Sequence, residues 1–436
     1  MVAQFNGANR KRVTANIILV ANAFVWYLIA FKILRELIVQ INSTSSETLL
    51  IIGINAGAIA IAGLIGSFIF DKFKSRRNFL FLWTASGVLL SIVPLGLNLQ
   101  NFSDIAVISL AFGIYFGLGM PATMGYHSFL TKIEERAKFG GYAFLIIGIV
   151  FPIVGLSVFD NIQASCLVLA LVRLLGLGIF YLLPKETQIK KEPQEKIKYK
   201  DILFNRPFVF YFVPWCMFTL INYMTIPIQQ TIFATEVDFN MLMAVEFVVT
   251  AIFALISGFV ADKFGRKRLA IIGFIMLGIG YAVIGLFANS NLHLTGIIYV
   301  FTDGVAWGIF YVLFLFTIWG DLAQGKNADK IYFLGALPYL SSYFMQLLLH
   351  PYLAGIQKEM IFSFASVFLF LAVLPLIYAP ETLPEKIMKD RDLRSYIEKA
   401  KKKATQDAEK GAKKSITKNK KEDKYQEAKK LAEKYY

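Results

Sequence analysis

The chain has 436 residues, of which 56% are hydrophobic and 17% are charged, and its 40 Phe outnumber its 30 acidic residues. A water-soluble core of this length cannot bury so much apolar surface, so the composition predicts a protein whose solvent is lipid. The net charge of +15 would suit nucleic acid, but 18 Lys or Arg and 10 acids lie in the last 53 residues, and most other bases lie between apolar runs. That distribution is typical of membrane topology and argues against a nucleic-acid partner.

Apolar windows long enough to cross a bilayer core of about 30 Å recur along the chain with short polar breaks. They predict twelve membrane-spanning helices, near residues 14–40, 47–70, 78–97, 104–126, 140–159, 163–183, 208–234, 241–261, 268–288, 293–319, 331–353 and 359–379. The first window follows Arg10, Lys11 and Arg12, as a signal peptide would. It is longer than 20 residues and no small-residue cleavage site follows, so it is predicted to be the first span.

Basic residues are concentrated in every second break between the predicted helices. The breaks after the second, fourth, sixth, eighth and tenth predicted helices each hold at least two Lys or Arg, whereas the intervening breaks hold none except Lys358. By the positive-inside rule, we expect a multi-pass protein of the cell membrane with both termini and the basic breaks in the cytoplasm.

The segment 184–207 is rich in charged residues that stay hydrated, so it cannot cross the membrane and is predicted to be a cytoplasmic linker. It separates an N-terminal six-helix bundle, residues 1–183, from a C-terminal six-helix bundle, residues 208–383. Residues 384–436 form a basic cytoplasmic tail, which suits either a contact with anionic lipid headgroups or a solvated disordered segment.

An internal repeat links the two halves. Asp71-Lys72-Phe73 recurs as Asp262-Lys263-Phe264 at an offset of 191, and Gly113 and Gly117 recur at the same offset as Gly304 and Gly308. The Pro-Lys-Glu-Thr run at 184–187 is echoed by Pro-Glu-Thr at 380–382. Three landmarks at nearly one offset indicate a duplication.

Over roughly residues 14–383 the sequence resembles the major facilitator superfamily. Residues 258–267 match its loop signature, Gly-x-x-x-Asp-Arg/Lys-x-Gly-Arg-Arg/Lys, at every defined position, whereas the first-half copy has Ser67 at the leading Gly position and lacks the Gly-Arg step. The resemblance implies an all-α integral membrane fold of twelve transmembrane helices in two pseudo-symmetric six-helix bundles. It also implies that substrate binds between the bundles, that helices 1, 4, 7 and 10 line the cavity, and that helices 2, 5, 8 and 11 form its walls.

The signature carboxylate suggests a gate. An acid at a cytoplasmic helix end can face the positive N-terminus of a helix from the opposite half, while neighbouring bases pair with it. In the family such latches break and re-form during alternating access. The predicted gating residues are Asp71, Lys72, Arg76, Arg77, Gly258, Asp262, Lys263, Gly265 and Arg266, and the alternative is that they only mark cytoplasmic turns.

Ionisable residues inside a span are costly unless they are paired or wetted, so they are candidates for proton coupling. Asp303 in the tenth helix is the sharpest of these, and Glu246 in the eighth resembles it but lies nearer the outer end. Lys32 and Glu36 share one face of the first helix. The alternatives are carboxyl groups that bridge helices and paired charges that reach the outer interface. Arg173 is expected to have a packing or lipid-facing role.

Aromatic and amide residues on the presumed cavity helices are the substrate-binding candidates, because aromatic faces combined with amides commonly hold sugars. They are Asn22, Trp26, Tyr27, Trp215, Asn222, Tyr223, Gln229, Gln230, Trp307 and Tyr311. For each aromatic residue the alternative is ordinary packing.

Neither a cofactor nor a metal is predicted. Cys166 and Cys216 fall inside apolar windows, and no Cys/His cluster has metal-ligand spacing. No Gly-rich phosphate cradle occurs, so ATP is not expected as the energy source.

These features predict a monomeric secondary transporter, not an enzyme, that moves a small polar solute such as a sugar or an organic acid, with proton coupling left open. One alternative is an efflux antiporter for drugs or metabolites, which the Gly148, Pro152 and Gly155 pattern in the fifth helix partly resembles. The Pro-Glu-Thr ending at 380–382 instead resembles sugar porters. Another alternative is a non-transporting membrane sensor with the same fold.

Overall fold

The structure is a computed structural model that describes residues 7–69, 75–158, 161–182, 197–233, 239–323, 327–353 and 355–385, with parts of the tail. All regular secondary structure in these segments is helical. The chain divides into two compact units, residues 1–383 and residues 384–436. Among the described residues, twelve helices are long and apolar enough to cross a membrane, which confirms the predicted number of spans.

The spans follow the order of the apolar windows. The first six are α1 (Gly7–Gln40), α2 (Ser45–Ile69), α3 (Arg76–Ile92), α4 (Phe102–Leu130), α5 (Arg136–Val158) and α6 (Ile162–Leu182). The next five are α8 (Arg206–Phe233), α9 (Phe239–Phe264), α10 (Arg266–Phe287), the continuous run α11 (Leu292–Phe310), η4 (Tyr311–Thr317) and α12 (Ile318–Ala323), and α13 (Ala328–Leu353). The twelfth is α14 (Lys358–Leu371) with α15 (Val373–Tyr378), and the short connecting helices are η2 (Val93–Gly96), η3 (Ile133–Glu135) and α7 (Tyr199–Leu203).

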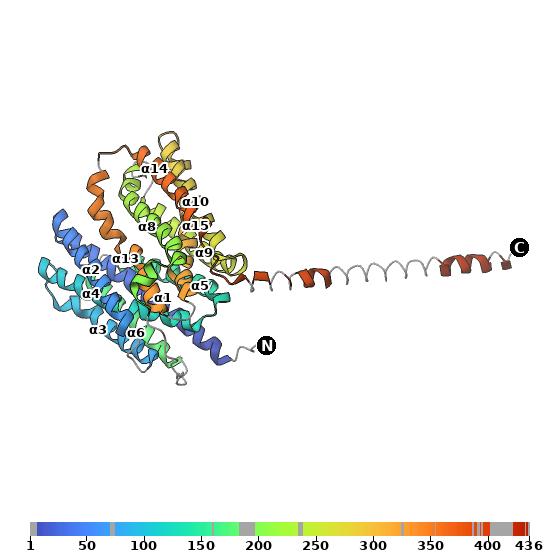
Figure 1. Cartoon of the computed structure of the whole chain (residues 1–436), viewed down its shortest axis with the longest axis horizontal. Helices are drawn as coiled ribbons and strands as arrows, with labels where there is room; N and C mark the ends of the chain where they lie inside the picture. The colour runs from blue at the N-terminus through green and yellow to red at the C-terminus, as the bar shows by residue number, and fades with distance from the viewer. Residues whose placement is uncertain are drawn as a thin grey trace. The chain divides into compact units, whose positions relative to one another are not determined.

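The two sets of six spans repeat one packing pattern. Within the halves, α2 packs along α4 and α9 packs along α11. Between the halves, α5 packs on α9 and α13 packs on α2 (Figure 1). The duplication relates the second span to the eighth and the fifth to the eleventh. The contact of the fifth span with the eighth is therefore equivalent to the contact of the eleventh span with the second. The two bundles are therefore pseudo-symmetric, as the fold class implies.

Repeated glycines allow these close helix contacts. A Cβ added at Gly117 of α4 would lie 2.6 Å from the Ile59 carbonyl oxygen of α2, and one at Gly308 would lie 2.8 Å from the Thr250 carbonyl oxygen of α9. The shared glycine pattern of the two halves thus has a packing function, because only a residue without a side chain lets the backbones approach this closely.

The tenth and twelfth spans differ from uninterrupted α-helices. The tenth contains the π-helical segment η4, in which the Thr317 hydroxyl donates to the Val312 carbonyl oxygen at 2.6 Å. Such segments often occur at functional sites. The twelfth span breaks between α14 and α15, where Pro375 has no backbone N–H to continue the helical ladder.

The interior of the first half is organised around Arg173 of α6, which is 1% exposed. Its Nε donates to the Tyr115 hydroxyl and its Nη1 donates to Asn22 Oδ1, both at 2.7 Å. The guanidinium carbon lies 4.2 Å from the centre of the Trp83 ring. Among the described residues no carboxylate pairs with Arg173, so neutral dipoles and ring faces stabilise its charge. The side chain faces the bundle interior and not lipid.

Candidate functional site

Asp262, at the end of α9, binds the first turn of α5 in the other half. Its Oδ2 accepts a hydrogen bond from the Lys138 backbone N–H at 2.9 Å, and its Oδ1 accepts one from the Ala137 N–H at 3.3 Å. The first N–H groups of a helix have no intrahelical partner and carry the positive end of its dipole. The carboxylate therefore joins the two halves at what we call the gate face, the face that carries Asp262 and the start of α5.

Arg266, which begins α10, lies fully buried beside Asp262. Its Nη2 donates to Asp262 Oδ1 at 2.8 Å, and its Nε donates to Asp321 Oδ2 of α12 at 3.1 Å. The preceding residue, Gly265, has φ +103°, a conformation that disfavours other residues, and a Cβ there would lie 2.5 Å from Glu381 Oε2. The signature glycine thus makes the sharp turn between α9 and α10 that places the Arg266 guanidinium inside.

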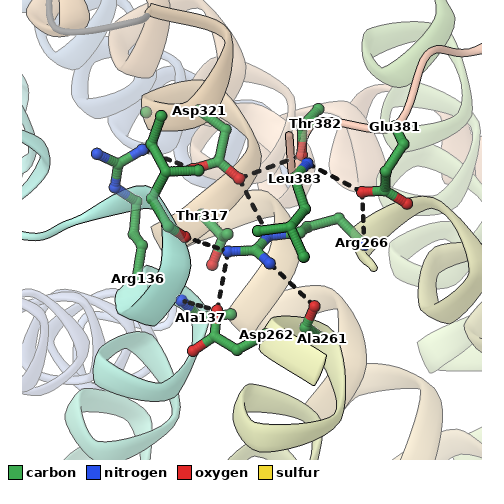
Figure 2. Close-up of polar contacts among 12 residues, drawn as sticks. Arg136, Ala137, Ala261, Asp262, Arg266, Thr317, Asp321, Glu381, Thr382 and Leu383 are labelled. Carbon is green, nitrogen blue, oxygen red and sulfur yellow. Dashed lines mark hydrogen bonds and ion pairs between the residues drawn. The ribbon is translucent and has the colours of Figure 1, made fainter. Parts of the chain in front are cut away.

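Asp321 joins Arg266 to a second buried arginine, Arg136, from the first half (Figure 2). Arg136 Nη1 donates to Asp321 Oδ1 at 2.6 Å, while its Nη2 donates to the carbonyl oxygens of Ser128 and Thr131 at 2.9 and 3.1 Å. The order Arg136–Asp321–Arg266–Asp262 alternates charge and leaves the buried network neutral. We call these four residues the gate network, and its completeness matters because a buried charge without its partner is strongly destabilising.

The Pro-Glu-Thr ending holds the gate network from the second half. Glu381 Oε1 and Oε2 accept from the backbone N–H groups of Arg266 and Lys267 at 2.8 and 3.1 Å, at the N-terminus of α10. The Thr382 hydroxyl donates to Asp321 Oδ2 at 3.1 Å. The motif therefore caps one helix and completes the hydrogen bonds of the central carboxylate.

The first-half signature departs at Ser67, and the short helix α7 contacts it there. Tyr199 of α7 and Ser67 of α2 share a hydrogen bond between their hydroxyls, and the Tyr199 ring packs against Phe333 of α13. Lys330 Nζ donates to the Ile197 carbonyl oxygen at 2.8 Å. Burial raises the pKa of the Tyr199 hydroxyl. This part of the predicted linker thus lies against both halves.

The other predicted gating residues have varied places. Asp71 and Lys72 lie outside the described residues. Arg77 Nη2 donates to the Phe180 carbonyl oxygen at 2.8 Å and Arg76 lies over a Phe ring, so both contact the first half. A Cβ at Gly258 would lie 2.6 Å from the Ala137 carbonyl oxygen, so that glycine brings α9 onto α5. Lys263 is exposed and contacts no partner in the other half among the described residues.

A cavity of about 120 Å³ lies inside the second half. Its lining comes from the seventh, eighth and tenth spans. The lining residues are Asn222, Tyr223, Ile226, Gln229, Met243, Glu246, Phe247, Thr250, Tyr299, Asp303, Trp307 and Tyr311. The resemblance implied a lining from helices 1, 4, 7 and 10 with walls from helices 2, 5, 8 and 11. Among the described residues the seventh, eighth and tenth spans line this cavity, as that scheme allows, and the first and fourth spans do not.

Two carboxyl groups face each other in this cavity. Glu246 of α9 and Asp303 of α11 are 7% and 1% exposed, and their side chains lie within hydrogen-bonding reach of each other. The Tyr299 hydroxyl donates to Asp303 Oδ2 at 3.1 Å. Glu246 Oε2 and Asp303 Oδ1 are buried and accept no hydrogen bond from a described donor. The structure therefore brings together the two acids that the sequence singled out separately, and we call them the acid pair.

Amides and rings surround the acid pair. The Tyr281 hydroxyl of α10 accepts from Asn222 Nδ2 at 3.0 Å and from Gln229 Nε2 at 3.4 Å, which turns both amides toward α10. The Trp307 and Tyr311 rings stack with centres 4.8 Å apart. Tyr311 also stacks on Phe144 of α5, at 4.2 Å, so one wall of the cavity rests on the other half.

Several substrate-binding candidates lie elsewhere. Asn22 holds Arg173, and Trp26 Nε1 donates to the Ser91 hydroxyl at 2.9 Å in the first-half core. Trp215 Nε1 donates to the Gly335 carbonyl oxygen at 2.8 Å, which ties α8 to α13. Other candidates outside the cavity lining are Tyr27, which stacks on Phe116, Gln230, which is exposed, and the coupling candidates Lys32 and Glu36. In each case spacing alone did not reveal which face of the helix turns inward.

The sequence did not predict that Arg136, Asp321 and Glu381 contribute to the gate network. Arg136 and Asp321 lie near the ends of predicted spans, where a charge is ordinarily solvated, so nothing in their local sequence marks them as buried partners. Glu381 carried a signal, because the Pro-Glu-Thr run is part of the repeat.

The structure has twelve spans in two related bundles, a charge network that joins the bundles, and a polar cavity within the membrane-spanning region. These features define a multi-pass membrane transporter. The family model of the Major Facilitator Superfamily matches residues 15–323. The fold is similar to the crystal structure of the human organic anion transporter MFSD10 (TETRAN), with a TM-score of 0.60 and 15% sequence identity, covering 84% of this chain and 99% of that one. A search of curated proteins gave no match. The chain belongs to the Major Facilitator Superfamily of secondary transporters.

Proposed function

We propose that the protein transports a small polar solute across the cell membrane in exchange or together with protons, and that the acid pair is the proton site. The observation that carries this proposal is the contact between Glu246 and Asp303, two buried carboxyl groups with no basic residue among the cavity lining. Two like charges in contact in a low-dielectric interior repel strongly, so the pair holds one proton between an oxygen of Glu246 and an oxygen of Asp303.

The gate network closes one side of this site. Asp262 and Asp321 each bind groups from both halves, so separating the halves at the gate face breaks several charge-assisted hydrogen bonds at once. Alternating access then requires the network to open as a unit. The proposal includes the predicted orientation, with the gate face and both termini in the cytoplasm.

The residues that line the cavity favour some classes of solute over others. An organic acid would place its carboxylate beside Glu246 and Asp303, with no Lys or Arg among the lining residues to balance the charge. A solute that donates hydrogen bonds suits the acid pair better. The cavity of about 120 Å³ is small beside the roughly 300–1,000 Å³ of pockets that hold drug-sized ligands, which favours a small cargo.

The test is transport by the full-length protein in proteoliposomes that contain a pH-sensitive dye, with a panel of sugars, amines and carboxylates. We expect at least one solute to drive proton movement in the wild type, and Asp303→Asn to abolish the proton movement. Asp104→Asn is the matched control, because Asp104 lies outside the cavity and accepts from the Asn98 backbone N–H. Proton movement that persists in Asp303→Asn, or is absent with every solute in the wild type, would contradict the proposal.

A further inference from the structure

The cavity has an excess of hydrogen-bond acceptors. Three buried oxygens on its lining, Glu246 Oε2, Asp303 Oδ1 and Gln229 Oε1, accept no hydrogen bond from any described residue. Buried polar atoms are nearly always paired, and one left unpaired costs about 1–3 kcal/mol. A proton held between the two carboxyl groups supplies one donor to the pair when the cavity holds no solute. A solute that replaces that proton must bring its own donors.

The cavity also favours positive charge. It presents two carboxyl groups and, among its lining residues, no Lys, Arg or His. Tyr223, Tyr299 and Trp307 add aromatic rings to the lining, and a cation near a ring face gains about 0.5–2 kcal/mol.

The groups around the acid pair do not supply this charge. Among the residues that the structure describes, the titratable neighbours of the acid pair are the hydroxyls of Tyr223 on α8, Tyr281 on α10, Tyr299 on α11 and Tyr311 on η4, none of them cationic. The charged residues of α5, which packs on α9, are at its start in the gate, about 24 Å along the helix axis from the level of Glu246.

We propose that the solute is a small organic cation with a protonated amino group, and that this ammonium group and the proton compete for the acid pair. The inference rests on the proposed function and names its substrate class. An ammonium group has three N–H donors and no acceptor, the complement of this lining. When it binds, the proton of the acid pair leaves to solvent, so the charge in the cavity is conserved and the cycle exchanges one cation for one proton. This supports antiport over symport.

The competition is tested by binding to the purified full-length protein in lipid nanodiscs, measured by calorimetry between pH 5 and pH 8. The probes are ethyl-, butyl- and hexylammonium, with 1-butanol, butanoate and tetramethylammonium as matched compounds that lack charge, reverse it or lack donors. We expect a primary ammonium to bind at least tenfold more tightly than all three, with an affinity that falls as the pH falls, by up to about tenfold per pH unit. Glu246→Gln should lose at least tenfold in affinity, and Asp104→Asn should lose none.

Three results would overturn the inference: equal or tighter binding of 1-butanol or butanoate, ammonium binding that does not change with pH, or unchanged ammonium affinity in Glu246→Gln. If Glu246→Gln does not fold, Glu246→Asp and the wild-type pH series decide the question. If a sugar moves protons through Asp303 in proteoliposomes while no ammonium binds, the proposed function survives and this inference fails. If no solute moves protons in the wild type, both fail.

Discussion

The two halves share one helix plan but fill their interiors in opposite ways. At the repeat offset of 191, Glu246 corresponds to Asn55 and Asp303 corresponds to Phe112. Asn55 and Phe112 also line a cavity, but its volume is only about 10 Å³, against about 120 Å³ around the acid pair. The first half is packed around a buried cation, Arg173, and the second half is hollow around two buried acids. The two halves therefore share their helix arrangement, and they differ at a few lining positions, where only the second half has ionisable side chains.

Buried arginines show the same contrast. Arg136 and Arg266 have carboxylate partners in the gate network, whereas Arg173 has neutral partners and ring faces. The paired arginines depend on charges from across the bundle interface. Arg173 depends only on its own half, so the two kinds of site should respond differently to substitution.

Removing the central carboxylate of the gate should have the largest effect on stability. Asp321→Ala leaves Arg136 and Arg266 buried without their shared partner, which is expected to cost about 3–5 kcal/mol. Unfolding in detergent monitored by tryptophan fluorescence measures the change. Lys263→Ala, which removes an exposed base next to Asp262 at the end of α9, should stay within about 0.5 kcal/mol of the wild type. Equal effects of the two substitutions would contradict the role given to the network.

Overpacking the first-half core should lower the stability of the protein without changing its transport. An added Cβ at Gly87 of α3 would overlap the Tyr115 hydroxyl and lie 2.9 Å from Arg173 Nε, so Gly87→Ala is expected to cost about 1–3 kcal/mol. At Gly57 of α2 nothing lies within 4 Å of an added Cβ, so Gly57→Ala should be neutral or stabilising.

Solute-driven proton movement by the Gly87→Ala protein that remains folded should match that of the wild type. Lost proton movement in that folded protein would mean that the first-half core takes part in coupling, and would break the comparison between the halves.

The smallest effect is expected at the first-half counterpart of the acid pair. Asn55 Nδ2 donates to the Ser109 carbonyl oxygen at 2.8 Å, so Asn55→Ala should cost about 1 kcal/mol in thermal unfolding through that lost hydrogen bond. Proton movement should be unchanged, in contrast to Glu246→Ala at the equivalent position. Loss of proton movement in Asn55→Ala would show that the two halves share the coupling chemistry.

The sequence predicted the features that rest on local pattern. Apolar length marked the spans, the repeat marked the two halves, and the signature placed Asp262 where a helix N-terminus of the other half meets it. It did not predict Asp321, whose partners Arg136 and Arg266 are distant in the chain and come together only when the bundles pack. The location of the cavity was also beyond its reach, because helices that are apolar on all sides give no signal of which face turns inward.

The number of protons released when the purified protein binds a solute tests the acid pair most directly. In weakly buffered detergent solution, a solute that is transported should release about one proton per molecule bound to the wild type, and none from Glu246→Gln or Asp303→Asn. An unchanged release from either variant would contradict the assignment of the proton to Glu246 and Asp303. Binding to the wild type without any release would contradict the exchange of the solute for that proton.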